Sequence, residues 1–557
     1  MRLGKWVLPM TLLCALTLSA CGGNKAKEND ASTPSTATKN SDGKYDPILT
    51  LKVAKQLDEN AGRYDKGDDI NNNPMTRLGE DKKGIKVETT LLGGDADNYA
   101  TKLRLALTGS EDLPDVFPVY DTQMISEMIE SGRAKAIDDD IEKYMPDRLK
   151  KIYDEFPETF YPVTEDGKTY GIAVAPTLVE GQVMIVREDW LEKLNLKAPT
   201  NMAEFEEVIK AFSEDDPDGN GKKDTYGFAY AGDSIYNTGW TGDSVNLFSA
   251  NTGKHIPGDW ADEGGQLVYG SIHEGNRKTL EKMASWHKQG YLFQEAAATG
   301  AWDAMTQFTE GKAGIFIGRP WCVSSVNDVT KNIDGAKVKA YPNIKQDNGE
   351  PTYQQAQVND GYFMFNKDFG EMEAFFDYYD WLYDVAFGTG DFNYGYLEDY
   401  DYDIVDDKVV FDASLFEPAK NPDNIFMPGK SIMTKNAPSI DNGGKSFFDV
   451  VNGKEAETGA ELRAEEGLQV LPEQVEAFAL AYEHNNELLP KLFNGAPTKT
   501  MKQKWEQLQT MEKQTYTNII YGKADISEFD KFVEQWKSQG GDEITKEVNE
   551  WYAEVKK

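Results

Sequence analysis

Short apolar runs alternate along this chain with segments whose apolar residues recur about every three or four positions. Runs of about four to eight apolar residues are typical of strands, and the longer period is typical of amphipathic helices. The pattern predicts strands over residues 48–54, 85–92 and 114–117 and helices over residues 97–108 and 123–130. Strands and helices that take turns in this way indicate an α/β fold.

The alternation continues toward the middle of the chain. Residues 168–176 are expected to be extended and residues 183–186 to form a strand. Asn201, followed by Glu204, is a typical capping box for a helix over residues 202–212. Near the C-terminus one helix has an apolar face that we assign to the core, made of Ile526, Phe529, Phe532, Val533 and Trp536.

The N-terminus has a different pattern. Arg2 and Lys5 precede an apolar run over residues 6–18, and small residues then lead to Cys21. A run of this length behind a positive start is typical of a secretory signal peptide and is too short to span a membrane. The spacing predicts cleavage before Cys21 and lipid attachment to it, which would anchor the protein in a membrane. The alternative is an ordinary secretory signal in which Cys21 is incidental.

A linker is expected to follow the signal. Residues 22–45 are rich in Gly, Asn, Lys, Ser, Thr and Asp and have almost no aliphatic side chains, so they cannot bury enough surface to fold. Residues 46–557 are long enough for two or more lobes with separate cores.

Charge and cysteine content limit the possible partners. The chain has 95 acidic and 59 basic residues and a net charge of -36, which argues against nucleic acid as a ligand. Of the three cysteines, Cys14 would leave with the signal and Cys21 would carry lipid. Cys322 then has no disulfide partner and is interpreted as a buried small hydrophobe.

Several segments together resemble a known family. They are Gly171-Ile172-Ala173-Val174-Ala175-Pro176 with Gln182-Val183-Met184-Ile185-Val186-Arg187-Glu188-Asp189-Trp190-Leu191; Gly311-Lys312-Ala313-Gly314-Ile315-Phe316-Ile317-Gly318-Arg319-Pro320-Trp321; and Ile519-Ile520-Tyr521-Gly522 with Asn549-Glu550-Trp551-Tyr552. The first resembles the hinge crossing of extracellular solute-binding proteins of ABC importers. The second resembles a strand and turn of the maltose-binding branch, and the third resembles the sugar-binding lipoproteins of Gram-positive bacteria.

This resemblance implies a two-lobed periplasmic-binding-protein-like fold of the α/β class, with a hinge and an interlobe cleft. The N-terminal lobe would contain residues 46–175 and about 340–435, and the C-terminal lobe residues 176–339 and about 436–557. The first crossing is placed near Ala175 and the second near Lys339-Ala340-Tyr341-Pro342. Residues within 388–488 exceed what a compact member of the fold needs, so we expect an extra subdomain there.

A calcium loop is predicted over residues 216–224. Oxygen side chains at the first, third, fifth and ninth positions, a Gly at the sixth and a backbone carbonyl at the seventh match the first part of an EF-hand loop. These positions are Asp216, Asp218, Asn220, Asp224, Gly221 and Lys222. The twelfth position is Gly227 in place of the usual Glu, so the remaining ligand must come from elsewhere, with Glu214, Asp215 and water as the candidates. A polar turn without metal is the alternative.

Candidate ligand-binding residues follow from the chemistry of sugars, which present apolar faces and rings of hydroxyl groups to flat aromatics and polar side chains. The resemblance implies Trp321 as a stacking residue, with Arg319 two residues before it. Positions after predicted strands or in polar loops add Tyr120, Asp121, Trp240, Trp302 and Asp360. Packing in the core is the alternative for each aromatic residue.

Two other classes of function remain to be weighed. A tethered glycoside hydrolase needs a pair of carboxylates, and 95 acidic residues neither support nor exclude one. An adhesion protein fits the acidity and the anchor, but the chain has no internal repeat. We therefore expect a monomeric, lipid-anchored protein on the outer face of a bacterial membrane, which captures a carbohydrate, most simply an oligosaccharide, passes it to an ABC permease and catalyses no reaction.

Overall fold

The structure is a computed structural model that describes residues 37–57, 64, 67–109, 112–232, 238–296, 299–412, 428, 433, 438 and 444–556. The predicted signal peptide, Cys21 and residues 22–36 lie outside these ranges. Among the helices of the described ranges, none combines the length and the apolar character that crossing a membrane would require.

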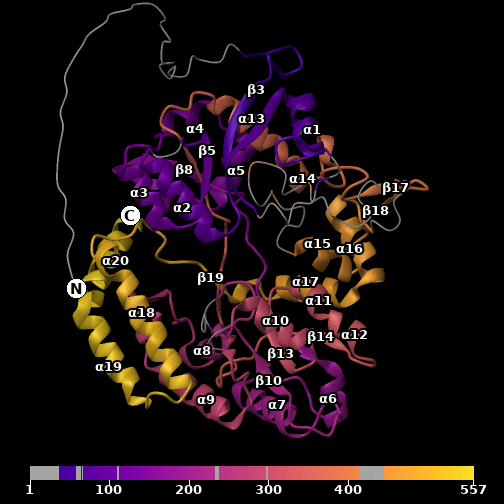
Figure 1. Ribbon diagram of the computed structural model, residues 1–557, viewed down its shortest axis with the longest axis vertical. Helices are drawn as coiled ribbons and strands as arrows, with labels where there is room; N and C mark the ends of the chain where they lie inside the picture. Colours follow the sequence, from indigo (N-terminus) through magenta and orange to yellow (C-terminus); the bar gives the residue numbers. More distant parts are fainter. Residues whose placement is uncertain are drawn as a thin grey trace, which may run out of the picture. The chain divides into compact units, whose positions relative to one another are not determined.

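A five-stranded sheet organises the first lobe, in the order β4-β3-β5-β16-β8 (Figure 1). The strands are β3 Leu49–Gln56, β4 Ile85–Gly93, β5 Val116–Val119, β8 Gly171–Ala173 and β16 Tyr362–Phe365. β3 pairs in parallel with β4 and β5, whereas β16 is antiparallel to both β5 and β8. The three strands predicted in this part of the chain are confirmed within a few residues at each end.

Helices cover this sheet and share one core with it. They are α1 Pro74–Lys83, α2 Ala96–Leu107, α3 Thr122–Glu130, α4 Asp138–Tyr144, α5 Asp147–Glu155, α13 Met372–Leu382 and α14 Asp384–Phe387. Strand residues such as Val53, Phe117 and Phe363 are almost completely buried among them. α13 and α14 follow each other directly, with Tyr383 between them.

A four-stranded sheet organises the second lobe, in the order β10-β13-β9-β14. Its strands are β9 Val183–Arg187, β10 Tyr226–Ala229, β13 Ala313–Gly318 and β14 Val338–Tyr341. β10 and β13 are parallel, and β9 is antiparallel to β13 and β14. In Figure 1 the strands β5 and β8 of the first sheet lie together, and the strands β10 and β13 of the second sheet lie together in another part of the molecule.

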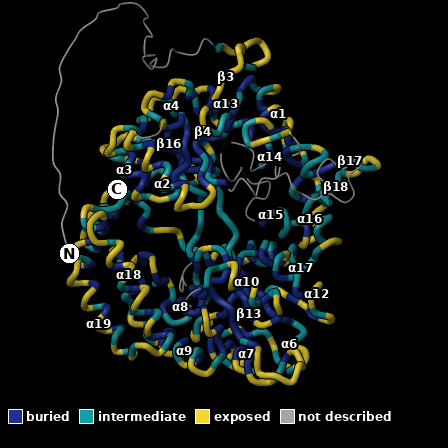
Figure 2. Tube along the Cα trace, viewed as in Figure 1, coloured by how far each residue is buried: buried dark blue, intermediate teal, exposed yellow. Residues whose placement is uncertain are grey.

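Both faces of the second sheet are buried, and the alternation along β9 shows how. Met184 and Val186 join one core, and Val183 and Ile185 join the other, because successive strand side chains point to opposite faces. The helices around these cores are α6 Glu188–Leu194, α7 Met202–Glu214, α8 Val245–Thr252, α9 Gly275–Gln289, α10 Ala301–Thr309, α11 Cys322–Val326 and α12 Asp328–Asn332. Figure 2 shows buried strands with exposed residues on the outer helices.

The C-terminal part adds two helical groups. α18 Met501–Ile520, α19 Ser527–Trp536 and α20 Asp542–Val555 pack on the second lobe, and the predicted apolar face supplies Phe529, Phe532 and Trp536 to its core. The second group is α15 Lys445–Val451, α16 Gly459–Val470 and α17 Pro472–Glu483, within the range in which an extra subdomain was expected. α17 gives Ala477 and Ala481 to the core beside α10 and α11.

The chain crosses between the lobes in segments that hydrogen-bond to each other. The amides of Val174, Thr177 and Val179 donate to the carbonyls of Gly361, Val358 and Gln357 at 2.8, 3.0 and 2.9 Å. The chain passes from the first sheet to the second between β8 and β9, in a segment that contains Ala175. The second crossing lies later than predicted, because Lys339, Ala340 and Tyr341 are held in β14 by their pairing with β9.

Ala175 has an unusual backbone conformation at this crossing. Its φ is 43°, in the left-handed region that costs residues with a Cβ atom conformational energy. The hydroxyl of Tyr379, on α13, accepts a hydrogen bond of 2.6 Å from the amide of Ala175. A further strand pair, β15 Gln354–Gln355 with β19 Leu488–Leu489, joins the return segment to the C-terminal part of the chain.

Residues 37–46 form a small hairpin in which β1 Thr38–Lys39 pairs with β2 Tyr45–Asp46. Asn40 Oδ1 accepts hydrogen bonds from the amides of Asp42 and Lys44 in the turn, and Lys39 Nζ lies 2.7 Å from Glu373 on α13. The end of the range predicted to be a linker is therefore folded, because its turn residues and a lysine find local partners.

The buried strand β13 provides a test of the second-lobe core. Ile315 has no exposed surface, so Ile315→Ala should lower the free energy of unfolding by about 2–5 kcal/mol through lost burial and the cavity left behind. Ile48→Ala makes the same chemical change at a side chain that is 52% exposed and should change it by less than about 0.5 kcal/mol. Urea denaturation of both variants measures the difference, and equal effects would contradict the assignment of β13 to the core.

Candidate functional site

Three of the tryptophans proposed from the sequence lie together on the second lobe. The ring centroids of Trp240 and Trp321 are 6.0 Å apart with planes 17° from parallel. Trp302 lies 5.4 Å from Trp240 and 6.0 Å from Trp321. Trp302 is 59% exposed, and the other two are half-buried. The three residues, which we call the tryptophan cluster, thus leave an aromatic surface open to solvent.

The sheet explains why residues so distant in sequence meet. β10 and β13 are parallel neighbours, so the segments that follow them start at the same edge of the sheet. The segment after β10 carries Trp240, and the segment after β13 carries Trp321. The amide of Arg319 donates to the carbonyl of Trp240 at 2.9 Å, which fixes the two segments side by side. Ligands of open α/β sheets bind at this edge, beyond the carboxyl ends of the strands.

Arg319 connects the tryptophan cluster to the hinge. One of its Nη atoms donates to the carbonyl of Gly239 at 2.8 Å and to the side-chain oxygen of Gln357, in the returning crossing segment. Burial lowers the pKa of the Arg319 guanidinium, and the nearby Glu180 carboxylate opposes that change. Burial likewise raises the pKa of Glu180. The two residues are half-buried, carry opposite charges and lie within electrostatic reach of each other next to the cluster.

Asp243 holds the loop that carries Trp240. Its side chain has no exposed surface, and Oδ2 accepts hydrogen bonds from the amides of Thr238 and Gly239 at 3.0 and 3.1 Å. Oδ1 accepts from the amides of Ser244 and Val245 at 2.6 and 2.7 Å. A carboxylate that receives several backbone N–H groups fixes the path of the loop around it.

Gln182 extends this arrangement toward the hinge. Its Nε2 donates to Asp243 Oδ2 at 2.8 Å, and its amide donates to the side chain of Gln354 in β15 at 2.7 Å. Asn343 Nδ2 donates to the Gln182 carbonyl at 2.7 Å. The Trp240 loop and the returning crossing segment are thus joined through buried polar side chains.

Tyr120 and Asp360 come from the first lobe and the hinge. Burial, and after it the charge of Asp360, raises the pKa of the Tyr120 hydroxyl. Asp360 also acts electrostatically on Arg319, so it lies within reach of side chains from both lobes. Gly361 has a φ of 88°, and a Cβ there would lie 2.6 Å from the Tyr120 ring, so this close approach requires glycine.

Asp121 has a different environment. It is exposed, and its Oδ1 accepts a hydrogen bond of 2.8 Å from the amide of Met124, which caps α3. The structure therefore brings Trp240, Trp302 and Trp321 together beside Arg319. It places Asp360 within electrostatic reach of both Arg319 and Tyr120, and it gives Asp121 a capping contact.

A cavity of about 470 Å³ lies at the first crossing segment. Residues 175–178 line it together with Phe156, Tyr383 and Phe387 of the first lobe and Tyr482 and Asn485 of the C-terminal part. This concave surface borders the hinge, and residues of the first lobe and of the C-terminal part of the chain both line it.

The predicted calcium loop follows α7 on the surface of the second lobe. Asp216 accepts a hydrogen bond of 3.1 Å from the amide of Gly221, and Asn220 Nδ2 donates to Asp218 at 2.6 Å and to Asp224 at 3.1 Å. Burial, with contributions from Asp216 and Asp224, raises the pKa of Asp218. The carboxylates therefore surround the Asn220 amide. Among the residues that the structure describes, Asp216, Asp218 and Asp224 do not bring one oxygen each within 4.8 Å of the other two.

Sequence reasoning missed three residues of this region, Glu180, Asp243 and Gln357. Each is a single polar residue in a loop, and its importance depends on the distant side chains that surround it. Cys322 was interpreted as a buried small hydrophobe, which is confirmed: it has no exposed surface, and burial raises the pKa of its thiol to about 12.

Replacing one oxygen of Asp243 tests its hold on the Trp240 loop. In Asp243→Asn an amide NH₂ faces backbone donors, so the amides of Thr238, Gly239, Ser244 and Val245 should exchange with deuterium at least about tenfold faster. Asp121→Asn is the control, because its effect should stay within α3. Unchanged protection of the loop would contradict the role given to Asp243.

Comparisons with known proteins agree with this architecture. The family model for bacterial extracellular solute-binding proteins matches residues 72–386. The Polygalacturonan/rhamnogalacturonan-binding protein YtcQ of Bacillus subtilis is 26% identical over 473 residues, 82% of this chain and 83% of the relative.

Two solved structures show the same fold. The crystal structure of alginate-binding protein AlgQ2 without calcium ion aligns with a TM-score of 0.63 at 19% identity, over 91% of this chain and 98% of that one. The S. pneumoniae ABC-transporter substrate binding protein FusA, as an EF-hand mutant in complex with fructo-nystose, aligns with a TM-score of 0.63 at 16% identity, over 91% and 99%. These likenesses confirm the two-lobed periplasmic-binding-protein-like fold, and since the family model covers more than half of the chain, the chain belongs to the bacterial extracellular solute-binding proteins.

Proposed function

We propose that this chain is the substrate-binding component of an ABC importer, that it captures a carbohydrate, most simply an oligosaccharide, and that it delivers the sugar to the permease. The observation that carries the proposal is the tryptophan cluster. Three indole rings from separate segments of the chain have centroids within 6.0 Å of one another, and the Trp302 ring, at the start of α10, is largely exposed. Exposed aromatic patches are uncommon on soluble proteins unless they bind something, and this chain has a net charge of -36. The aromatic surface therefore supports binding of a ligand that has apolar faces.

The surroundings of the cluster suit a sugar. The C–H face of a sugar ring can stack on an indole, while its hydroxyl groups need donors and acceptors at the edge. Arg319, Glu180 and Gln357 stand at that edge, and Asp360 lies within electrostatic reach. A binding role for Trp240, Trp302, Trp321, Arg319, Tyr120 and Asp360 is part of this proposal; Asp121 would act indirectly, by capping α3.

The hinge supplies a means of signalling. Crossing segments that hydrogen-bond to one another allow the lobes to close as rigid bodies around a ligand. Closure would give the permease a combined surface from both lobes, which the open form lacks. The proposed lobes are residues 46–175 with about 340–435 and residues 176–339 with about 436–557, adjusted for the later second crossing.

The relatives support a carbohydrate ligand. The names of the YtcQ and AlgQ2 proteins state that they bind polygalacturonan or rhamnogalacturonan and alginate, and the FusA structure contains fructo-nystose. For the present chain we propose only the class, an oligosaccharide. We also propose that Cys21 carries lipid and holds the protein on the outer face of the membrane as a monomer.

The tryptophan cluster gives the direct test. A panel of oligosaccharides is titrated against the purified protein, and a ligand at about 100 times its Kd should add about 2.7 kcal/mol of stability. For the sugar that binds, Trp302→Ala and Trp321→Ala should each weaken binding by at least about tenfold, because a desolvated aromatic contact is lost. Isothermal titration calorimetry measures both affinities.

Trp505→Ala is the matched control. Trp505 is half-buried and packs against the core of the second lobe, with its ring centroid 5.3 Å from that of Tyr269. Its replacement should leave sugar affinity within about twofold. Equal affinity in the cluster variants and the wild type would remove the cluster from the site. Appearance of shorter glycans during the titration would instead favour the alternative, a tethered glycan-degrading enzyme.

We also propose that the loop of residues 216–224 binds calcium with a structural role. The side chains of Asp216, Asp218, Asn220 and Asp224 and the backbone carbonyl of Lys222 supply oxygens of the kind that calcium prefers. Crowding of carboxylates around one amide group supports this, because a cation placed among them would balance their charge. The Asn220 side chain would have to turn its oxygen inward.

Calcium at about 100 times its Kd should stabilise the wild-type protein by about 2.7 kcal/mol relative to protein with chelator. The double replacement Asp216→Ala and Asp224→Ala should abolish this difference, because two of the oxygen ligands are removed. Asp334→Ala, at an exposed carboxylate outside the loop, should keep it. Thermal unfolding with calcium and with chelator measures the effect, and an unchanged calcium response in the double variant would place the ion elsewhere.

A further inference from the structure

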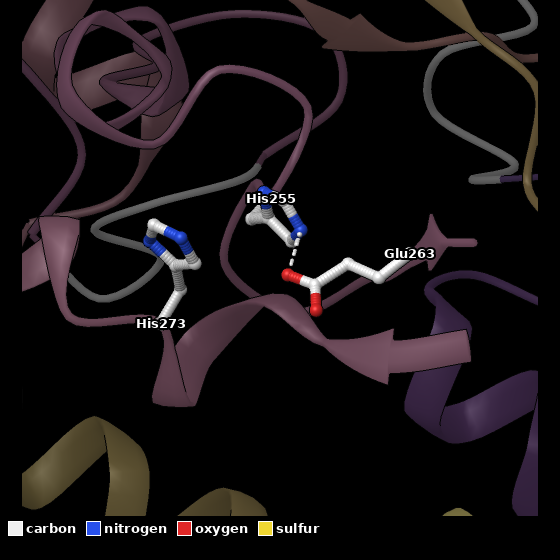
Figure 3. Close-up of side chains that lie close together, drawn as sticks. All are labelled: His255, Glu263 and His273. Atoms are coloured by element: carbon white, nitrogen blue, oxygen red, sulfur yellow. Dashed lines mark ion pairs between the residues drawn. The ribbon is translucent and has the colours of Figure 1, made fainter. Parts of the chain in front are cut away.

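Two histidines and a glutamate, His255, His273 and Glu263, lie close together on the second lobe (Figure 3). None of them belongs to the tryptophan cluster or to the calcium loop. His255 belongs to the loop after α8, Glu263 ends strand β11 Trp260–Glu263, and His273 follows strand β12 Gln266–Tyr269 and a short helical turn, Gly270–Ile272. One potential ligand atom from each residue lies within 4.8 Å of the other two. Among the His, Cys, Asp and Glu residues of the described ranges, this is the group that meets that spacing.

The contact between His255 and Glu263 requires a positive charge. His255 Nδ1 lies 3.1 Å from the carbonyl of Thr252, an acceptor, so Nδ1 carries a proton. In the neutral ring Nε2 then carries no proton and has a lone pair, so it can only accept a hydrogen bond. That atom lies 2.8 Å from Glu263 Oε1, which is also an acceptor. Two acceptors at this distance repel each other unless a proton or a metal ion lies between them.

We propose that His255, Glu263 and His273 bind a divalent transition metal ion of the zinc class. Imidazole nitrogens favour such ions over calcium, and two histidines with one carboxylate are a recurrent zinc ligand set that leaves a fourth position for water. The Thr252 carbonyl contributes as well, because it fixes the His255 tautomer that presents Nε2 to the ion.

The histidine rings must adjust for the ion to bind. They now stack with centroids 4.5 Å apart and planes 13° from parallel, so one ring has to turn before both nitrogens face the same point. His273 Nδ1 accepts a hydrogen bond of 3.1 Å from the amide of Gly275, which metal binding through Nε2 would break. Glu263 can follow these movements, because its side chain is 53% exposed.

An ion at this position would join three segments that meet near the hinge. The hairpin of β11 and β12 begins next to Asp259, whose carboxylate accepts a hydrogen bond of 2.7 Å from Gln355 in β15. β15 belongs to the returning crossing segment. The proposed role of the ion is therefore structural, as a cross-link between His255, the tip of the hairpin and His273.

Zinc titration of the purified protein, with calcium in excess to occupy the other loop, tests the proposal. We expect one zinc ion per chain by isothermal titration calorimetry. Glu263→Gln and His273→Gln should each weaken zinc binding by at least about tenfold. Glu263→Gln alters an exposed side chain, so it separates loss of a ligand from loss of the fold, and thermal unfolding without zinc should match that of the wild type.

His484→Gln is the matched control. His484 lies 2.6 Å from Glu487 and so forms the same kind of pair without a second histidine, and its replacement should leave zinc affinity unchanged. Anomalous X-ray scattering at the zinc edge should place the ion between His255 and His273. Absence of zinc binding, equal affinity in the Glu263 and His273 variants, or an anomalous peak elsewhere would each overturn the proposal.

Discussion

The hydrogen bonds between the two crossing segments are the contact on which the rest of the structure depends. The sheets of the two lobes have separate cores, and the amides of Val174, Thr177 and Val179 join one crossing segment to the other. Arg319 reaches the same segment through Gln357. A change in the pairing would therefore move polar groups next to the tryptophan cluster, which links the geometry of the hinge to that of the site.

Buried polar side chains, more than aliphatic packing, shape the loops around this site. Asp243 and Gln182 are almost completely buried. Asp243 accepts from loop amides and from the Gln182 side chain, and the Gln182 amide donates to Gln354 in β15. Groups of this kind are costly to bury without partners, so each one specifies a single loop path. The loop that carries Trp240 is therefore held by these polar contacts, and it does not depend on the packing of the half-buried indole ring.

Much of the fold was predictable because it depends on local pattern. The strands at residues 48–54 and 85–92 and the apolar face with Phe529 and Trp536 follow from periodicity and were found. The second crossing was predicted too early. The local sequence of residues 339–341 is compatible with a strand in either lobe, and their assignment to the second lobe depends on pairing with β9, which is distant in sequence. The meeting of Trp240, Trp302 and Trp321 depends on parallel strands in the same way, and the acceptor contact of His255 with Glu263 leaves no mark on the sequence.

The position of β16 also sets an order for folding. This strand lies between β5 and β8, yet residues 362–365 follow β8 only after the sheet of the second lobe has been completed in sequence. The first sheet consequently stays open in its middle until most of the chain has been synthesised, and closing it requires contacts between distant residues, which form slowly. An incomplete chain that ends before residue 362 would expose the edges of β5 and β8, both free to pair with other chains.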